Sequence, residues 1–184
     1  MMDMIMRRRE MMQTPGSTPP IYPIQLFTTI TTYKKNTTRG SITVLSNGFR
    51  LVSTGSANWA LNINPTGTTS DFKTWAELKG HTIKFEFTVL WATTKTGATA
   101  VLSACLCDSV IDPGTRFAYE ELVISITDSG LMTWTFVVPE TAAEWTNNNN
   151  PSDTDFFMYR IFFHAPSGAD IYIQPFACYD MGII

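Results

Sequence analysis

Apolar and polar residues alternate with a period of two along most of the chain beyond residue 24. The clearest run covers residues 81–92, where every second side chain is apolar and the intervening ones are polar or charged. The apolar positions are Ile83, Phe85, Phe87, Val89 and Trp91. Because successive side chains of a strand point to opposite faces, this run predicts a β-strand and excludes a helix. At about 3.3 Å per residue the strand is about 40 Å long.

Similar strands are expected at short spacing through the rest of the chain. They cover residues 24–33, 41–45, 49–53, 59–63, 98–107, 117–127, 131–138, 155–164 and 169–179. The pair Asn47-Gly48 predicts a hairpin between the second and third of these, because both residues tolerate the positive φ of a two-residue turn. Asp128-Ser129-Gly130 predicts a second hairpin. The last two strands are apolar at nearly every position, which is typical of central strands buried on both faces.

Helix is expected at two short segments of the body of the chain, besides a short helix at residues 2–12. Residues 74–80 carry a capping box, with Thr74 at the N-cap and Glu77 three residues later, and Gly80 closes the turn. Residues 140–145 form a short helix or loop. Because crossover helices are lacking, a parallel βαβ fold is excluded. The pattern predicts an all-β fold, an antiparallel two-sheet sandwich of jelly-roll type, over residues 24–184.

Residues 1–23 differ in composition and predict an extended N-terminal arm. The Pro-rich segment 13–20 can form neither a helix nor a central strand. The expected partner-binding residues of the arm are Met4, Met6, Arg7, Arg8, Arg9, Met11 and Met12. Methionine packs adaptably on irregular apolar surfaces, and arginine pairs with acidic ones. The alternative is a leader that makes no contribution.

Charge is sparse, and its distribution excludes several classes of partner. Charged residues make up 16% of the chain, the net charge is −3 and the pI is about 5.3. A nucleic-acid partner is not expected, because no basic stripe crosses the body of the chain. A membrane-spanning helix is not expected either, because no run of eighteen apolar residues exists. The arginines follow the first apolar residues, which is the reverse of a secretory signal.

The cysteines and histidines predict neither a disulfide framework nor a metal site. Three cysteines, an odd number, stand at positions 105, 107 and 178. Cys105 and Cys107 share one face of a strand, and we expect buried free thiols in a reducing cytoplasm. His81 and His164 have no partners at ligand spacing, so neither a metal nor a cofactor is expected.

The residues predict no catalytic arrangement, so we expect that the protein is not an enzyme. No Gly-x-Ser-x-Gly elbow is present. Glu120 and Glu121 are adjacent on a strand and point to opposite faces, so they cannot flank one glycosidic bond. Asp153 and Asp155 follow Pro151 in a polar stretch, where solvated acids or a weak Ca²⁺ site are ordinary outcomes.

Aromatic residues offer the better functional hypothesis. The candidate stacking platforms for a glycan are Tyr119, Tyr159 and Trp145, the last of which stands beside the run of four asparagines. Each of these side chains also fits a hydrophobic core. Trp59, Trp91 and Trp134 are expected in the core.

Two segments resemble a known group of domains. The capped turn and strand at residues 75–87 resemble the opening of carbohydrate-binding-module-like sandwiches. The ending at residues 169–182 is similar to the last strand of such domains in bacteriophage tail and capsid appendage proteins, which often closes in Leu-Glu-x-Gly. Here the ending is Tyr179-Asp180-Met181-Gly182. The basic start at residues 7–12 resembles the leaders of small virion proteins from gut phages.

The resemblance covers residues 1–12 and 41–182, and it carries no sugar-binding residue over to this chain. It implies a non-enzymatic virion structural protein of a bacteriophage, made in the host cytoplasm, that decorates a capsid, fibre or tail. Its partners would be other virion proteins and further copies of itself. The alternative is a carbohydrate-binding module used in host adhesion or in a bacterial glycan system. Head, tail or fibre position, stoichiometry and the partner of the arm stay open.

Overall fold

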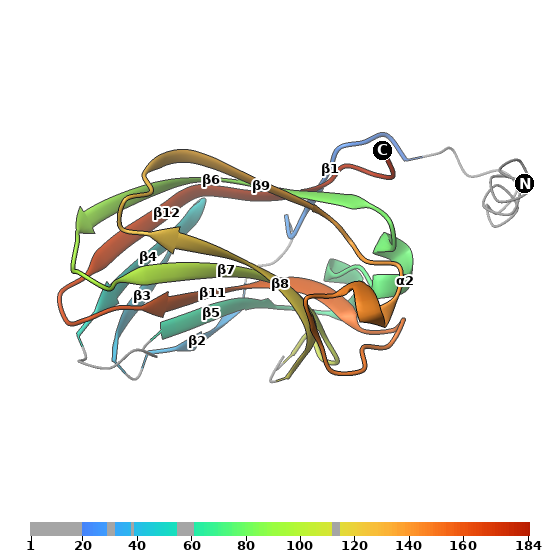
Figure 1. The fold of residues 1–184 in the computed structure, drawn as a ribbon, viewed down its shortest axis with the longest axis horizontal. Coiled ribbons are helices and arrows are strands. Elements are labelled where there is room, and N and C mark those ends of the chain that lie inside the picture. Colours follow the sequence, from blue (N-terminus) through green and yellow to red (C-terminus); the bar gives the residue numbers. More distant parts are fainter. Residues whose placement is uncertain (1–19, 29–31, 38, 55–60, 112–114) are drawn as a thin grey trace, which may run out of the picture.

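Two antiparallel sheets packed face to face make up the protein (Figure 1). The structure is a computed structural model that describes residues 20–28, 32–37, 39–54, 61–111 and 115–184. Within these residues each sheet has six strands, which confirms the predicted antiparallel sandwich. The predicted contacts of the arm through Met4, Met6, Arg7, Arg8, Arg9, Met11 and Met12 lie outside the described residues.

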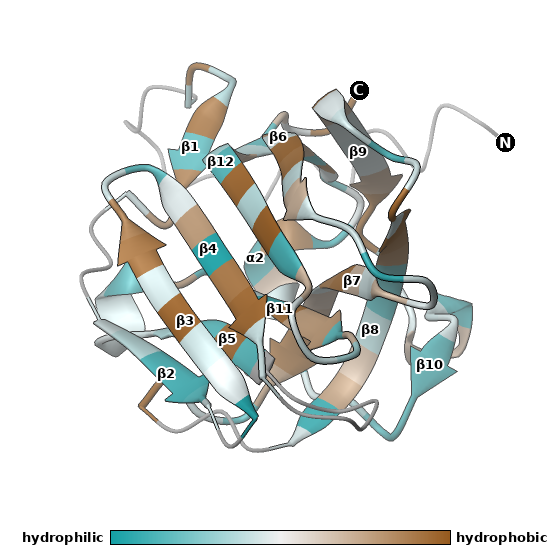
Figure 2. Ribbon diagram, turned by 90° about the vertical axis from the view of Figure 1, so that its left-hand side faces the viewer, coloured by the Kyte–Doolittle hydropathy of each residue, from teal (hydrophilic) through white to brown (hydrophobic). Residues whose placement is uncertain are grey.

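The first sheet, sheet A, has β12 at its centre. Its order is β3-β4-β12-β6-β9, and β1 also pairs with β12. The strands are β1 (Ile24–Leu26), β3 (Gly40–Leu45), β4 (Gly48–Ser53), β6 (Thr82–Thr93), β9 (Gly130–Val137) and β12 (Asp170–Asp180). Every second side chain of β3, β4 and β12 is apolar, and the ribbon coloured by hydropathy shows this as alternating bands (Figure 2).

The second sheet, sheet B, has β7 and β11 at its centre. Its order is β10-β8-β7-β11-β5-β2. The strands are β2 (Thr32–Asn36), β5 (Leu61–Thr66), β7 (Thr99–Cys107), β8 (Arg116–Ser125), β10 (Asn147–Asn148) and β11 (Phe156–His164). Both faces of β11 are largely buried, as its continuous apolar sequence predicted.

Helical turns are short and lie between strands. The helix α2 (Trp75–Leu78) begins at Thr74, whose hydroxyl and backbone N–H both donate to the Glu77 carboxylate. Gly80 follows with a φ of 74°, so the predicted capping box and glycine stop are confirmed. Two 3₁₀ turns, η2 (Thr69–Asp71) and η3 (Ala142–Glu144), complete the helical content of the described residues.

The hairpin predicted at Asn47-Gly48 is confirmed, although glycine serves a different purpose there. Leu45 pairs with Gly48, so Ser46 and Asn47 form the turn and Gly48 begins β4. The φ of Gly48 is not positive. Instead, a Cβ at this position would collide with the carbonyl oxygen of Ile173 on β12. The glycine therefore permits close approach of two backbones.

Two strand predictions are corrected by the pairing. The strands around Asp128-Ser129-Gly130 do not form a hairpin, because β8 pairs within sheet B and β9 pairs with β6 in sheet A. The turn instead leads the chain from one sheet to the other. The single strand predicted over residues 24–33 is likewise two strands in different sheets, β1 and β2. At Asp128-Ser129-Gly130 the sequence indicates a reversal but not the sheet in which the next strand lies, and within residues 24–33 it indicates no break between strands.

The core lies between the two sheets and is rich in aromatic rings. Phe85, Phe157 and Tyr159 are almost fully buried in it, and Trp134 stacks on Phe85 with ring centroids 5.3 Å apart. Trp91 and Trp134 are half-buried against this core, as predicted, and Trp59 lies outside the described residues. Full burial of one such side chain contributes about 1.5–3 kcal/mol, so these rings dominate the stability of the sandwich.

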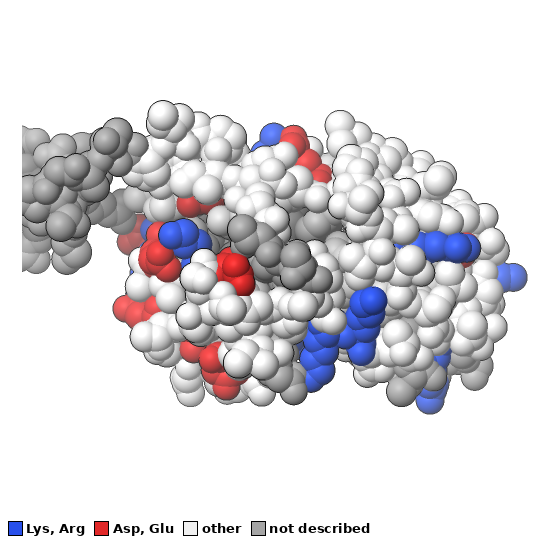
Figure 3. Space-filling model, turned by 180° about the vertical axis from the view of Figure 1, so that it is seen from behind, with Lys and Arg blue, Asp and Glu red and all other residues white. Residues whose placement is uncertain are grey.

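The outer surface carries few charges. Seen from behind, most of it is uncharged, with acidic side chains gathered toward one end of the sandwich (Figure 3). No helix in the described part of the chain is long and apolar enough to cross a membrane.

Candidate functional site

The outer face of sheet B carries a pocket of about 200 Å³, here called the sheet-B pocket. The residues that line it are Val101, Arg116, Tyr119, Glu121, Phe162 and His164. They come from β7, β8 and β11, which are adjacent in the sheet. Because side chains alternate along each strand, Tyr119 and Glu121 on β8 and the even positions of β11 point to this same face. Arg116 is an even position of β8 and lies beyond the register shift between Leu106 and Cys107, where the alternation is interrupted.

The strand register arranges these side chains in rows across the sheet. Phe162 on β11 lies opposite Val101 on β7, and Val101 lies opposite Val123 on β8. The neighbouring row contains Ser103 opposite Glu121. An apolar row therefore borders a polar row within the pocket, and Val123 extends the apolar row with a side chain that is 58% exposed.

Arg116 is the central side chain of the sheet-B pocket. Its guanidinium carbon lies 3.8 Å from the ring centroid of Tyr119 and 4.8 Å from that of Phe162. One guanidinium nitrogen donates to Ser103 Oγ at 2.8 Å and to Glu121 Oε1 at 2.6 Å. Cation–π contacts and the ion pair hold the planar group between two rings. The pocket thereby presents planar groups and hydrogen-bonding groups side by side.

Glu121 and His164 supply the remaining polar groups. The Glu121 side chain is one-third exposed, and that of Arg116 is 20% exposed. The His164 ring lies 6.4 Å from the Phe162 ring, centroid to centroid. The adjacent Glu120 points elsewhere, because its carboxylate accepts from the backbone N–H and hydroxyl of Thr146. Glu120 and Glu121 therefore have different partners, Thr146 and Arg116.

A buried thiol pair lies beside the pocket on the same face. Cys105 Sγ and Cys107 Sγ are 3.9 Å apart, and Arg160 Nη2 donates to Cys107 Sγ at 3.5 Å. The hydrogen bond from Cys105 and the nearby Arg160 charge lower the pKa of Cys107 despite its burial, whereas burial raises the pKa of Cys105. Both thiols are free and fully buried, as the sequence predicted.

The three aromatic residues expected as platforms have different locations. Tyr119 lines the sheet-B pocket and is half-buried. Trp145 is 3% exposed, and Tyr159 is 2% exposed in the core between the sheets. Their ring faces are covered by other side chains, so neither forms a platform on the outer surface. The burial of Tyr159 in a core of aromatic rings also raises the pKa of its hydroxyl well above the ordinary value.

The sequence does not predict that Arg116, Glu121, Phe162 and His164 line one pocket. A usable signal was present in β11, because its even positions from 156 to 164 share a face. The uniformly apolar composition of that strand concealed the alternation. The described residues contain no group of three or more His, Cys, Asp or Glu arranged to hold a metal ion.

Comparison with known proteins identifies the fold but no close relative. No family model matches the chain, and no curated protein matches it. Among solved structures, the xylan-binding module CBM15 is 13% identical over 88% of this chain and 97% of its own, with a TM-score of 0.50. An arabinose-bound α-L-arabinofuranosidase, MgGH51, is 12% identical over 86% of this chain and 24% of its own, also with a TM-score of 0.50.

A family 29 carbohydrate-binding module from Piromyces equi is 13% identical over 87% of this chain and 86% of its own, with a TM-score of 0.46. At these identities the likeness concerns the fold alone. The protein has a β-sandwich of the type found in carbohydrate-binding modules.

Proposed function

We propose that the protein is a non-catalytic glycan-binding domain and that the sheet-B pocket is its binding site. The observation that carries the proposal is the arrangement of Tyr119, Arg116 and Phe162, with the guanidinium held between two rings and paired with Glu121. This function was the alternative expected from the sequence.

The chemistry of a sugar ring matches this arrangement. A pyranose has apolar C–H faces and a rim of hydroxyl groups, so it requires flat apolar surfaces next to donors and acceptors. Tyr119 and Phe162 provide the ring surfaces, which combine a large apolar area with defined geometry. Arg116 donates hydrogen bonds and Glu121 accepts them. A pocket with apolar walls and a few convergent polar groups is the general form of a small-ligand site.

Binding without hydrolysis is favoured by the carboxylates. Glycoside hydrolysis ordinarily requires two carboxyl groups on either side of the scissile bond. Among the residues that line the pocket, Glu121 is the one carboxylate, and Arg116 already pairs with it at 2.6 Å. Such pairing suits a group that positions a ligand rather than one that donates a proton.

Xylan is the first ligand to test, because the xylan-binding module CBM15 shares the fold. Affinity electrophoresis and calorimetry with xylan, arabinoxylan, cellulose fragments and a broad glycan array would identify the ligand. For the ligand found, Tyr119→Ala and Phe162→Ala should each weaken binding about tenfold or more, equivalent to about 1.4 kcal/mol. Thermal unfolding would verify that each variant retains its fold.

A matched control exists on the opposite sheet. There Arg50 lies 5.1 Å from the Tyr172 ring centroid and pairs with Asp170 at 2.8 Å, a similar set of residue types outside the pocket. Tyr172→Ala should leave glycan affinity unchanged. A blank array, or equal losses from Tyr119→Ala and Tyr172→Ala, would contradict the proposed site.

A role in a bacteriophage particle stays a prediction from the sequence. It is compatible with glycan binding, because a virion protein can use a sugar-binding domain for adhesion. The motivating feature is the change of composition in residues 1–23, of which 1–19 lie outside the described residues. Deletion of residues 1–20 should abolish incorporation into particles, and full incorporation of the shortened protein would exclude an anchoring arm.

A further inference from the structure

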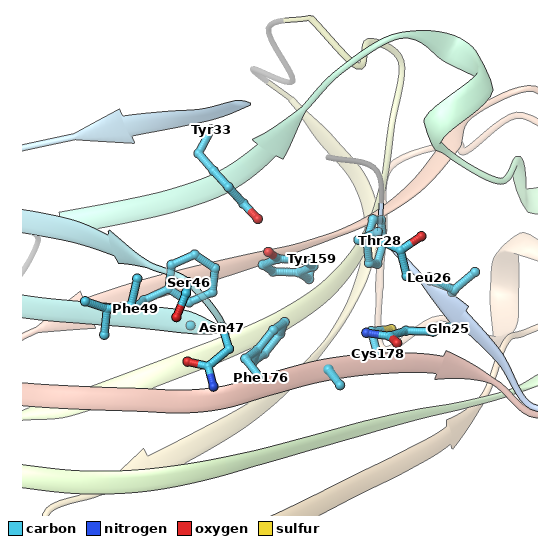
Figure 4. Close-up of a pocket in the computed structure, with 14 residues that line it drawn as sticks. Gln25, Leu26, Thr28, Tyr33, Ser46, Asn47, Phe49, Tyr159, Phe176 and Cys178 are labelled. Atoms are coloured by element: carbon cyan, nitrogen blue, oxygen red, sulfur yellow. The ribbon is translucent and has the colours of Figure 1, made fainter. Parts of the chain in front are cut away.

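A second pocket lies at the side of the sandwich, between the two sheets. It is here called the inter-sheet pocket, and its volume is about 240 Å³. It is surrounded by residues 25–28, the turn between β3 and β4, Tyr33 on β2, Tyr159 on β11 and residues 176–178 on β12. Figure 4 shows Asn47 and Gln25 on either side of Phe176, and the Tyr33 hydroxyl directed toward Tyr159. It shares no lining residue with the sheet-B pocket.

Aromatic rings form the inner wall of the inter-sheet pocket. The Tyr159 and Phe176 ring centroids are 4.8 Å apart, and the two planes are tilted by 50°. Phe49 meets Phe176 edge to face at 5.7 Å and Tyr33 edge to face at 5.6 Å. These mutual contacts fix the rings. Tyr159 and Phe49 are almost fully buried and support the wall from behind, whereas Phe176 and Tyr33 are half-buried and are the rings that a ligand would meet.

Neutral polar groups surround the mouth. Gln25, Ser46 and Asn47 are exposed there, and no Asp, Glu, Lys or Arg is among the described residues that line the pocket. Side-chain amides and hydroxyls both donate and accept hydrogen bonds. The mouth therefore offers many hydrogen-bonding partners but no partner for an ionic group, which favours a neutral ligand with several hydroxyls.

The backbone at the mouth adopts a conformation that requires support. Phe27 has a φ of 62°, which is uncommon for a residue other than glycine, asparagine or aspartate. In this conformation its ring packs edge to face on Tyr159 at 5.2 Å and on Phe72 at 5.9 Å. Backbone strain of this kind persists where surrounding contacts enforce it, and it is concentrated at functional sites.

The volume limits the size of the ligand. A cavity of about 150 Å³ holds benzene, which has six non-hydrogen atoms. In the same proportion, a pocket of about 240 Å³ holds roughly ten non-hydrogen atoms. A pentopyranose unit has that number, whereas a disaccharide has about twice as many.

We propose that the inter-sheet pocket is a second binding site, which takes one neutral sugar unit of pentose size against its aromatic wall. Because the inner end is closed by Tyr159 and Phe49, the unit enters from the mouth as the end or a side branch of a glycan. The site is independent of the sheet-B pocket and does not rest on the function proposed for it.

The test uses the full chain labelled with ¹⁵N and titrated with methyl β-xyloside. We expect saturable shifts of the backbone amides of Asn47, Gly48 and Phe176, with a dissociation constant on the order of 1–10 mM for so small a ligand. Sodium glucuronate, which is charged, should give no saturable shift at these amides. Gln25→Ala should weaken binding several-fold through loss of hydrogen bonds.

Two further variants show whether the xyloside occupies the inter-sheet pocket itself. Thr28→Trp places a large side chain at the mouth and should abolish binding, whereas Thr43→Trp, on the exposed outer face of β3, should not. Tyr119→Ala, in the sheet-B pocket, should also leave these shifts unchanged. The proposal is overturned if the xyloside produces no saturable shift at the pocket, if Thr28→Trp binds like the unaltered protein, or if 4-methylphenol displaces the xyloside and binds more tightly.

Discussion

At the scale of single residues, the environment of an arginine distinguishes the sheet-B pocket from the outer face of sheet A, although both carry similar residue types. Arg116 and Arg50 each contact a tyrosine ring and a carboxylate. Arg116 also contacts Phe162 and lies in a pocket, and its side chain is 20% exposed, compared with 42% for Arg50. Partial burial reduces solvent screening, so the contacts of Arg116 are the more strongly ordered of the two.

We expect Arg116→Ala to lower glycan affinity by at least tenfold. The change removes the guanidinium donors from the pocket and leaves Glu121 without its ion-pair partner. Arg116→Lys should recover little of the lost glycan affinity, because an ammonium group cannot replace a planar guanidinium between two rings. Calorimetric titration measures the effect, with Arg50→Ala as the control. Equal affinity in Arg116→Ala and the unaltered protein would show that the guanidinium does not contact the ligand.

At the scale of elements, local signals predicted the helical turn correctly and the strand connections only in part. The capping box joins Thr74 to Glu77, three residues later, so whether it forms depends on the local sequence alone. The turn at Asp128-Ser129-Gly130 is decided by the partners of β8 and β9, which are β7 and β6. Sequence at the turn specifies a reversal of direction, whereas packing of whole sheets selects the partner strand.

Glu77 should make the stability of the protein depend on pH. Burial opposes its charge, but hydrogen bonds from Thr74 and Lys73 outweigh burial and lower its pKa. A carboxylate with a lowered folded-state pKa stabilises the fold above its unfolded pKa, and this contribution is lost as pH falls through the folded value. Glu77→Gln should therefore cost about 0.5 kcal/mol at neutral pH, near the low end for caps because the side chain is 47% exposed.

The comparison of urea unfolding at two pH values tests this linkage. The difference between Glu77→Gln and the unaltered protein should shrink at the lower, acidic pH, because the carboxyl group of Glu77 takes up a proton as pH falls through its lowered pKa. A difference of the same size at both pH values would mean that shape, and not charge, accounts for the effect.

At the scale of the whole molecule, the alternation of apolar residues predicted the sandwich but not which face of each strand lies inside. The inward face of β6 is clear because its other face is charged. Both faces of β11 are apolar, and the sequence could not separate the core ring of Tyr159 from the pocket ring of Phe162. Tyr119 lines the sheet-B pocket, whereas Trp145 is buried.

The two-sheet core predicts a large difference between inward and outward substitutions. Phe85→Ala should destabilise the protein by about 3–5 kcal/mol, because a fully buried ring stacked on Trp134 is removed. Leu131→Ala, at a side chain that is 76% exposed, should change stability by about 0.5 kcal/mol or less. Urea unfolding measures both variants. Comparable losses would contradict the assignment of the inward face of sheet A.

The location of the glycan site is tested most directly by amide shift mapping with a xylan oligosaccharide on the ¹⁵N-labelled full chain. We expect saturable shifts concentrated on β7, β8 and β11 around Val101, Tyr119 and Phe162, and their loss in Tyr119→Ala. Shifts confined to the outer face of sheet A around Tyr172, or no saturable shift with any glycan that binds the protein, would contradict the proposed site.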